Sequence, residues 1–259
     1  MQIFLKNLNI VPMKNLLLCF VLIISLISCD KDSSFEPNFN NSNSGGQSGS
    51  TASIITYKGF IYTLDNNILK TLSLADPAHP VEVSNITIGE GVETIFAYED
   101  HLYLGTRNGV LLYNISDGSK PAYTGTSLHW PARDPVVVSG NLAYSTTRWG
   151  EEGNGNGTLQ VLDVTNKSTP FAINSVSQEY PCGLGINEGI LYVCNARFGI
   201  NVFEAGAFGE LTFVRNIPSD PLYDCIIAKD LMICQGKTGI YLYNISQKSA
   251  PVFIQKVAN

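Results

Sequence analysis

Histidine, tryptophan, methionine and charged residues are all scarce in this 259-residue chain. It has three histidines, two tryptophans and three methionines, and Asp, Glu, Lys and Arg together make up 15% of the residues. No two of the six cysteines are separated by two residues, which gives little support to a C-x-x-C zinc or thiol redox motif. The sequence therefore contains no catalytic constellation that stands out, and it predicts neither a cofactor nor a metal site.

Sustained helical periodicity is also absent, and short apolar runs interrupted by polar residues fill most of the chain. Tyrosine and phenylalanine occur 12 times each and glycine 23 times, a composition that favours β-structure. Without residues 1–28 the chain has 14 basic and 22 acidic side chains, a net charge of −8. Because of this acidic balance, we do not expect nucleic acid as a partner.

The first 28 residues resemble a bacterial lipoprotein signal peptide. A thirteen-residue apolar run at 16–28 follows Lys14, and it is too short to span a bilayer as a helix. It ends in Leu-Ile-Ser before Cys29, as in a lipobox, which implies cleavage before Cys29, lipidation of its thiol and a membrane anchor there. A plain signal peptide or a membrane anchor with an incidental cysteine is the alternative. Met13 is a candidate natural start.

Residues 29–53 are predicted to be a flexible tether. They are rich in Ser, Asn and Gly, and such a chain has a root-mean-square reach of about 25 Å. Asp30 and Asp32 follow the cysteine and resemble the export signal of surface lipoproteins in Bacteroidetes, although they are equally explained as solvated linker charge. The predicted location is the bacterial outer membrane with a lipid anchor, and the sequence leaves both a surface-exposed and a periplasm-facing orientation open.

The rest of the chain repeats one unit. The sequence Gly-Val-Leu-Leu-Tyr-Asn-Ile-Ser at 109–116 returns as Gly-Ile-Tyr-Leu-Tyr-Asn-Ile-Ser at 239–246, and a proline follows each copy. A tyrosine recurs with a spacing of 41, 41 and 48 residues, and a methionine takes the fifth place 40 residues later. These positions are Tyr62, Tyr103, Tyr144, Tyr192 and Met232. A period near forty with short β-like runs is typical of propeller blades.

We therefore predict an all-β fold, a β-propeller of five four-stranded blades over residues 54–259. The five units are 54–91, 92–132, 133–182, 183–220 and 221–259. In the second unit, the expected strands are 93–98, 101–105, 110–115 and 122–127. Propellers often close by completing one blade with strands from both chain ends, but no spare strand precedes Ile54.

In the second, third and fifth units an apolar third strand ends on Asp or Asn and is followed by Ile or Val and then Ser or Thr, and in four of the five units a polar turn ends in proline. The first unit is the most degraded copy. This pattern resembles the LVIVD-repeat family across residues 54–259, and the closest copy is Leu-Gln-Val-Leu-Asp-Val-Thr at 159–165. The resemblance implies a β-propeller of a kind common in bacterial secreted or lipid-anchored proteins. It implies no particular activity.

In a propeller, the starts of the inner strands and the loops between second and third strands lie on one face, at a mouth of the central channel. The side chains expected there are the carboxylates Glu93, Asp134 and Asp224, the cations Arg107, Arg148 and Arg197, and the aromatics Trp130, Trp149 and Phe198. They could hold a sugar or a short peptide by arginine forks and ring stacking. Alternatively, the acids and bases pair between blades and fill the channel.

Two functions fit this arrangement. The first is a non-enzymatic binding or scaffold domain for a protein or glycan, with the long loop at 148–157 as its best contact element. The second is a lyase or hydrolase, in which Glu93, Asp134 or Asp224 act as acid and base and Arg107 or Arg148 orients the substrate.

Four further cysteines follow Cys29. They are Cys182, Cys194, Cys225 and Cys234, of which Cys194 and Cys234 take near-equivalent places in adjacent units. We predict that they serve as small buried hydrophobes. Disulfides within a blade, between Cys182 and Cys194 or between Cys225 and Cys234, are the alternative.

Overall fold

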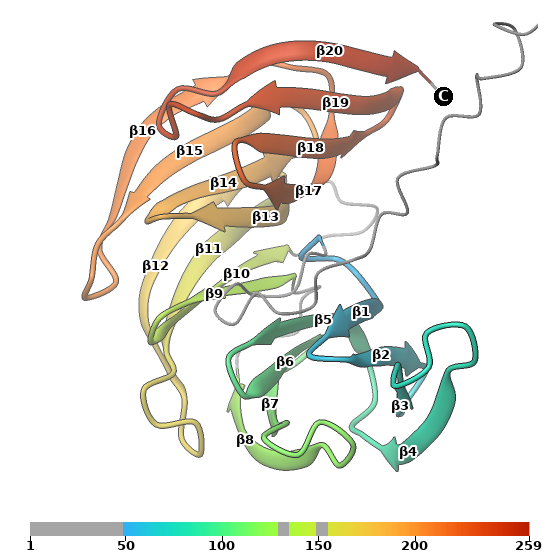
Figure 1. Cartoon of the computed structure of the whole chain (residues 1–259). Coiled ribbons are helices and arrows are strands. Elements are labelled where there is room, and N and C mark those ends of the chain that lie inside the picture. The colour runs from blue at the N-terminus through green and yellow to red at the C-terminus, as the bar shows by residue number, and fades with distance from the viewer. Residues whose placement is uncertain (1–48, 129–134, 149–154, 259) are drawn as a thin grey trace, which may run out of the picture. The chain divides into compact units, whose positions relative to one another are not determined.

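The computed structural model describes residues 49–128, 135–148 and 155–258, and these residues form strands and turns only. Twenty strands assemble into five four-stranded antiparallel sheets, each built from four consecutive strands (Figure 1). The chain is thus an all-β, five-bladed propeller, which confirms the predicted fold. Within the described residues there is no helix long and apolar enough to cross a bilayer.

The blades follow one another along the chain. The strands are β1 (Ile54–Tyr57), β2 (Phe60–Asp65), β3 (Ile68–Ser73) and β4 (Val81–Thr87) in blade 1; β5 (Val92–Tyr98), β6 (His101–Thr106), β7 (Gly109–Asn114) and β8 (Ala122–Leu128) in blade 2; β9 (Val136–Ser139), β10 (Leu142–Arg148), β11 (Asn156–Asp163) and β12 (Phe171–Glu179) in blade 3; β13 (Pro181–Asn187), β14 (Ile190–Asn195), β15 (Gly199–Ala205) and β16 (Leu211–Ile217) in blade 4; and β17 (Leu222–Ala228), β18 (Leu231–Gly236), β19 (Gly239–Asn244) and β20 (Val252–Ala258) in blade 5. The first strand of each blade contacts the first strand of the next, so the first strands surround the centre.

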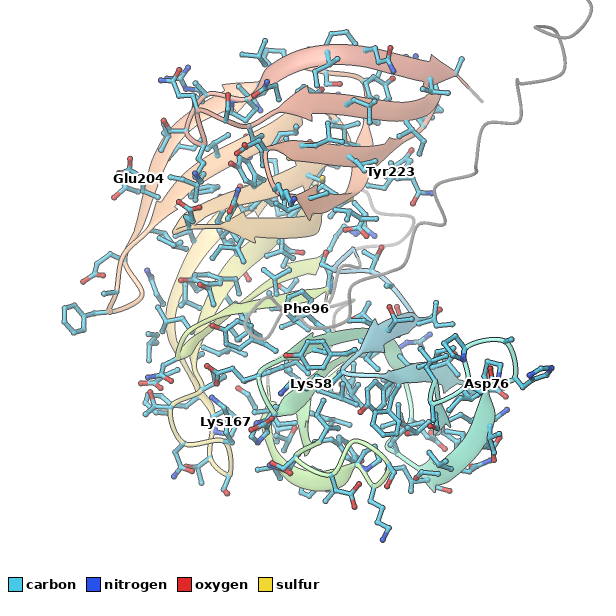
Figure 2. All side chains as sticks on the ribbon, viewed as in Figure 1. Lys58, Asp76, Phe96, Lys167, Glu204 and Tyr223 are labelled. Carbon is cyan, nitrogen blue, oxygen red and sulfur yellow. The ribbon has the colours of Figure 1, made fainter. Side chains whose placement is uncertain are left out.

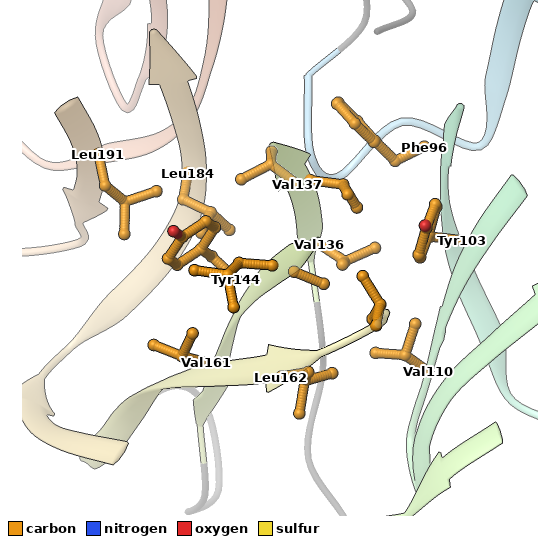
Figure 3. Packing of buried hydrophobic residues seen from close by; sticks show 14 of the residues in the cluster. Phe96, Tyr103, Val110, Val136, Val137, Tyr144, Val161, Leu162, Leu184 and Leu191 are labelled. Atoms are coloured by element: carbon orange, nitrogen blue, oxygen red, sulfur yellow. The ribbon is translucent and has the colours of Figure 1, made fainter. Parts of the chain in front are cut away.

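The middle blades are covered on both faces. Blade 3 packs Val136 and Val137 among side chains of blades 2 and 4, including Tyr103 and Leu184 (Figure 3). The second strands β10 and β14 are accordingly buried along almost their whole length. Residues buried on both faces of a strand give the continuous apolar runs seen in the sequence.

The terminal blades are covered on one face only. Burial alternates along β3 in blade 1 and along β18 and β19 in blade 5, as it does when one face of a strand meets a neighbouring sheet and the other does not. Blades 1 and 5 stand at the two ends of the series in Figure 1. Blade 5 therefore does not close the ring by packing its face against blade 1.

A bulge in every fourth strand, at the same point of its pairing with the third strand, aligns the five repeats in space. The third-strand residues on either side of the bulge are Thr71/Leu72, Leu112/Tyr113, Val161/Leu162, Val202/Phe203 and Leu242/Tyr243. A β-bulge adds one residue to a strand and changes the direction of the side chains that follow. In blades 2, 4 and 5 the residue after the bulge forms an edge-to-face aromatic pair with the fourth strand. These pairs are Tyr113–Tyr123, Phe203–Phe213 and Tyr243–Phe253, with ring centroids 5.5–5.7 Å apart.

The bulges also show which second-strand residues are equivalent. In blades 1 to 4 the recurrent tyrosine pairs with the residue just before the bulge, as Tyr192 does with Val202. In blade 5 the residue before the bulge is Leu242, and it pairs with Ile233. The expected place of Met232 is therefore wrong by one residue, because the recurrent residue is the third of each second strand, which is Tyr192 in β14 and Ile233 in β18.

Two of the four recurrent tyrosines connect their blade to the next one by a hydrogen bond. Tyr62 donates a hydrogen bond of 2.9 Å to the carbonyl of Gly118, and Tyr192 donates one of 2.8 Å to the carbonyl of Lys248. Each acceptor lies in the turn between the third and fourth strands of the following blade. Blade 5 is the last of the blades that the structure describes, and the equivalent Ile233 has no hydroxyl to donate.

The four described cysteines are free thiols, and all are buried, as predicted. Since the repeats are offset by one residue, Cys194 and Cys234 are not equivalent. Cys194 faces blade 5, Cys234 faces blade 4, and the two pack together with Cys225 in one cluster. Hydrogen bonding to Cys225 and Cys234, together with burial, raises the pKa of Cys194, so these thiols are hydrophobic contacts at the interface between blades 4 and 5.

The tyrosine connections can be tested by removing single hydroxyl groups. Tyr192→Phe deletes the hydrogen bond to Lys248 and should lower the free energy of unfolding by about 1 kcal/mol. Tyr103→Phe is the matched control, because the buried Tyr103 hydroxyl has no partner among the described residues. That variant should be neutral or slightly more stable. Urea unfolding would measure both, and equal losses in the two variants would contradict the role given to Tyr192.

Candidate functional site

Backbone hydrogen bonds place the loops between second and third strands beside the starts of the first strands. The amide of Arg107 donates to Gly91, Ala196 to Tyr180 and Lys237 to Pro221, over 3.0–3.1 Å. The same bond therefore recurs in blades 2, 4 and 5. The two sets of residues expected to share one mouth of the channel do lie together.

A short segment before β1 crosses this mouth. We call residues 49–53 the crossing segment. The Ala52 carbonyl accepts from the amide of Ile95 in blade 2, and the Ser50 hydroxyl accepts from the amide of Leu184 in blade 4, at 2.8 and 2.7 Å. Ser50 is completely buried. The crossing segment thus contacts first strands on opposite sides of the centre.

The main partner of the crossing segment is Asp224 in β17 of blade 5. Ser50 Oγ donates to Oδ1 over 2.9 Å, and Thr51 donates to Oδ2 from its hydroxyl over 2.6 Å and from its amide over 3.2 Å. Two glycines leave room for the carboxylate. A Cβ on Gly49 would lie 2.0 Å from Oδ2, and one on Gly183 would lie 2.1 Å from Oδ1. Both oxygens of Asp224 are therefore engaged and enclosed.

Burial and hydrogen bonding act on the pKa of Asp224 in opposite directions. The residue is 8% exposed, and burial raises its pKa above 3.8, while the hydrogen bonds from Thr51 and Ser50 act in the opposite direction. A carboxylate that accepts hydrogen bonds on both oxygens has little freedom to take a proton from a substrate. Asp224 therefore joins blade 5 to the crossing segment, which precedes β1.

A pocket of about 310 Å³ lies beside the crossing segment. It takes residues from blades 2 to 5 as well as from that segment. Its walls are Thr51, Glu93, Thr94, Pro135, Thr146, Arg148, Pro181, Cys182, Gly183 and Tyr223. We call it the mouth pocket. Tyr223, at the start of blade 5, is 39% exposed (Figure 2).

Arg148 is the cation of the mouth pocket. It ends β10 and is half-buried, and its Nη1 donates over 3.1 Å to the sulfur of Cys182. Among the described residues, Arg148 has no other hydrogen-bond partner. Burial raises the pKa of Cys182, which keeps its thiol neutral, so that Arg148 faces a weak acceptor without charge.

The other predicted residues are distributed unevenly. Glu93 lines the mouth pocket and accepts from Arg107 Nε over 3.2 Å. Arg197 lies outside the pocket, where it donates to the Tyr180 hydroxyl over 2.8 Å and stacks on the rings of Tyr180 and Phe198. Trp130, Asp134, Trp149 and residues 149–154 of the long loop lie outside the described residues. The binding roles of all these side chains stay predictions.

The sequence did not single out Thr51 and Tyr223. Tyr223 could have been found, since it precedes Asp224 at an inner-strand start. Thr51 could not, because it lies in low-complexity sequence that predicts no order. Among the described side chains, no group of three or more His, Cys, Asp or Glu is placed to hold a metal ion.

The family comparison bears on the repeat. A family model described as the LVIVD repeat matches residues 132–178, which include the closest copy noted above. The chain carries the LVIVD repeat. No curated protein sequence matches this LVIVD-repeat propeller.

Several solved structures are similar to this chain in fold. A periplasmic gluconolactonase from Pseudomonas aeruginosa has a TM-score of 0.60 at 11% identity, over 78% of this chain and 68% of that chain. A functionally unknown protein from Desulfotomaculum acetoxidans has a TM-score of 0.58 at 11% identity, over 84% and 70%. A hypothetical selenium-binding protein from Sulfolobus tokodaii has 0.54 at 12%, over 78% and 60%. At such identities, the similarity concerns the fold alone.

The environment of Asp224 predicts a pH dependence of opposite sign to that of Asp220. Because the pKa of Asp224 is higher in the folded than in the unfolded state, the protonated side chain stabilises the fold at low pH. This contribution is lost as the pH rises through the folded-state pKa. Hydrogen bonds from Tyr241, Lys256 and Thr238 lower the pKa of Asp220 below 3.8, so its contribution is lost as the pH falls.

Urea unfolding between pH 3 and pH 7 would measure both contributions. The stability of wild type relative to Asp224→Asn should decrease as the pH rises above about 4, whereas that relative to Asp220→Asn should increase across the acid range. Slopes of the same sign for the two variants would contradict the buried, enclosed state of Asp224.

Proposed function

We propose that this LVIVD-repeat propeller is a binding protein of the bacterial cell envelope and that the mouth pocket takes one sugar unit of a glycan. The observation that carries the proposal is the state of the charged groups at the mouth. The carboxylate of Asp224 is occupied by the crossing segment, and that of Glu93 is paired with Arg107. Among the residues that the structure describes, the partner of Arg148 is a thiol, which leaves its guanidinium for a ligand.

The pocket walls support a sugar. Tyr223 offers a partly exposed ring, and Pro135 and Pro181 add apolar surface, while threonine hydroxyls supply polar groups. An apolar surface with a few placed polar groups is typical of small-ligand sites. The pocket volume of about 310 Å³ suits a single sugar better than a folded protein surface.

Hydrolysis is the alternative, since one protein of similar fold is named a gluconolactonase. General acid and base catalysis by carboxylates requires two of them with suitable separation and freedom. Of the two described candidates, Asp224 is buried under Gly183 and the crossing segment. This favours binding over turnover.

A screen on immobilised glycans followed by calorimetry would test the proposal. Tyr223→Ala should weaken binding of a captured glycan by about tenfold or more, because a stacked ring contributes roughly 1–3 kcal/mol. Phe208→Ala is the matched control, since Phe208 is a fully solvent-facing aromatic on a turn between third and fourth strands, at 85% exposure. Equal effects of the two variants, or conversion of the glycan to a product detected by NMR, would overturn the proposal.

The envelope location rests on the lipobox-like sequence before Cys29. Cys29→Ala should move the protein from the membrane fraction to the soluble fraction, since the anchor would be absent. Cys19→Ala is the control, because Cys19 lies within the apolar run and should not be lipidated. Membrane retention of Cys29→Ala would contradict the anchor, and protease treatment of intact cells would separate surface exposure from a periplasmic orientation.

A further inference from the structure

The mouth pocket carries one charge for which the described residues supply no charged partner. Arg148 has five N–H donors in a planar fork, and within the described parts of the chain one of them has a partner, the sulfur of Cys182 at 3.1 Å. Sulfur is a weak acceptor, and removing a cation from water without a matching anion is unfavourable. A guanidinium in this state is well suited to a bidentate carboxylate supplied by a ligand.

The carboxylates of the two neighbouring acids are engaged by other residues. Glu93 is the one acidic residue among the described pocket walls, and Arg107 Nε lies 3.2 Å from its carboxylate. Asp224 lies behind Gly183, and both of its oxygens accept hydrogen bonds from Ser50 and Thr51. Arg148 is therefore the charged side chain among the described pocket walls with which a ligand can pair.

The other residues that line the mouth pocket limit the size and the chemistry of the ligand beside its carboxylate. Thr51 and Thr146 each donate their hydroxyl hydrogen within the protein, to Asp224 and to the Cys182 carbonyl, so their oxygens remain as acceptors for ligand hydroxyl groups. Tyr223 offers the face of a ring. A volume of about 310 Å³ is at the small end of ligand pockets, which span roughly 300–1,000 Å³.

We propose that the mouth pocket binds an acidic monosaccharide, free or at the end of a glycan, with its carboxylate on Arg148 and its ring against Tyr223. The proposal rests on the proposed function, because it names the class of sugar that the same site takes. The carboxylate fits the unsatisfied guanidinium, the hydroxyl groups fit the threonine oxygens, and the apolar face of the ring fits the tyrosine.

Matched pairs of sugars isolate the carboxylate. Glucuronate differs from glucose, and galacturonate from galactose, by a carboxylate in place of a hydroxymethyl group. In calorimetry or ligand-observed NMR, wild type should bind each acid at least about tenfold more tightly than its neutral partner, as expected for hydrogen bonds to a charged group. The preference should weaken as salt is added.

Variants of Arg148 assign the preference to one side chain. Arg148→Met should reduce binding of the acids to the level of the neutral sugars, and Arg148→Lys should leave an intermediate preference, because lysine keeps the charge and loses the fork. Arg197→Met is the control, since Arg197 is on the same face outside the pocket and should leave the preference unchanged. Unchanged melting temperatures would show that the variants fold.

The outcomes separate this inference from the proposed function. Binding of neutral and acidic sugars with equal affinity, dependent on Tyr223, would overturn the preference for acids and leave the sugar-binding pocket standing. A preference for acids that persists in Arg148→Met would overturn the role of Arg148. If neither acidic nor neutral sugars bind at all, both the inference and the proposed function are wrong.

Discussion

The hydrogen bonds between Asp224 and the crossing segment are the interaction on which the arrangement of the blades depends. Each middle blade is fixed by apolar packing on two faces, but blades 1 and 5 are covered on one face only. The ends of the series are joined instead by Ser50 and Thr51, which donate to a carboxylate of low exposure. Away from water such hydrogen bonds are stronger, so a few can hold what packing does not.

This form of closure also shapes the candidate site. Thr51 belongs both to the join and to the wall of the mouth pocket, and Gly183 covers Asp224 while it lines the same pocket. The carboxylate that would be the most attractive acid in an enzyme is therefore structural. Among the described pocket walls the charged group with few partners is a cation, Arg148, and the proposal that the pocket binds an anion rests on it.

The recurrent tyrosine has a structural role in the repeat. Its ring fills the interface between blades, and its hydroxyl reaches a carbonyl in the next blade where one is within reach, as for Tyr62 and Tyr192. The change to Ile233 in the last blade fits a position with no blade beyond it. Cys194 is the fifth residue of β14 and Cys234 the fourth of β18, and because successive residues of a strand point to opposite faces, the two thiols meet between blades 4 and 5.

The sequence by itself determined the five-bladed fold and the face on which the inner-strand starts meet the loops, because strand period, turn residues and repeat length are local properties. It also placed Glu93 and Arg148 at that face. Only the tertiary structure decided that Asp224 is enclosed and that Thr51 and Tyr223 complete the pocket. Those facts depend on contacts between residues as much as 174 positions apart, for which a repeat pattern carries no information.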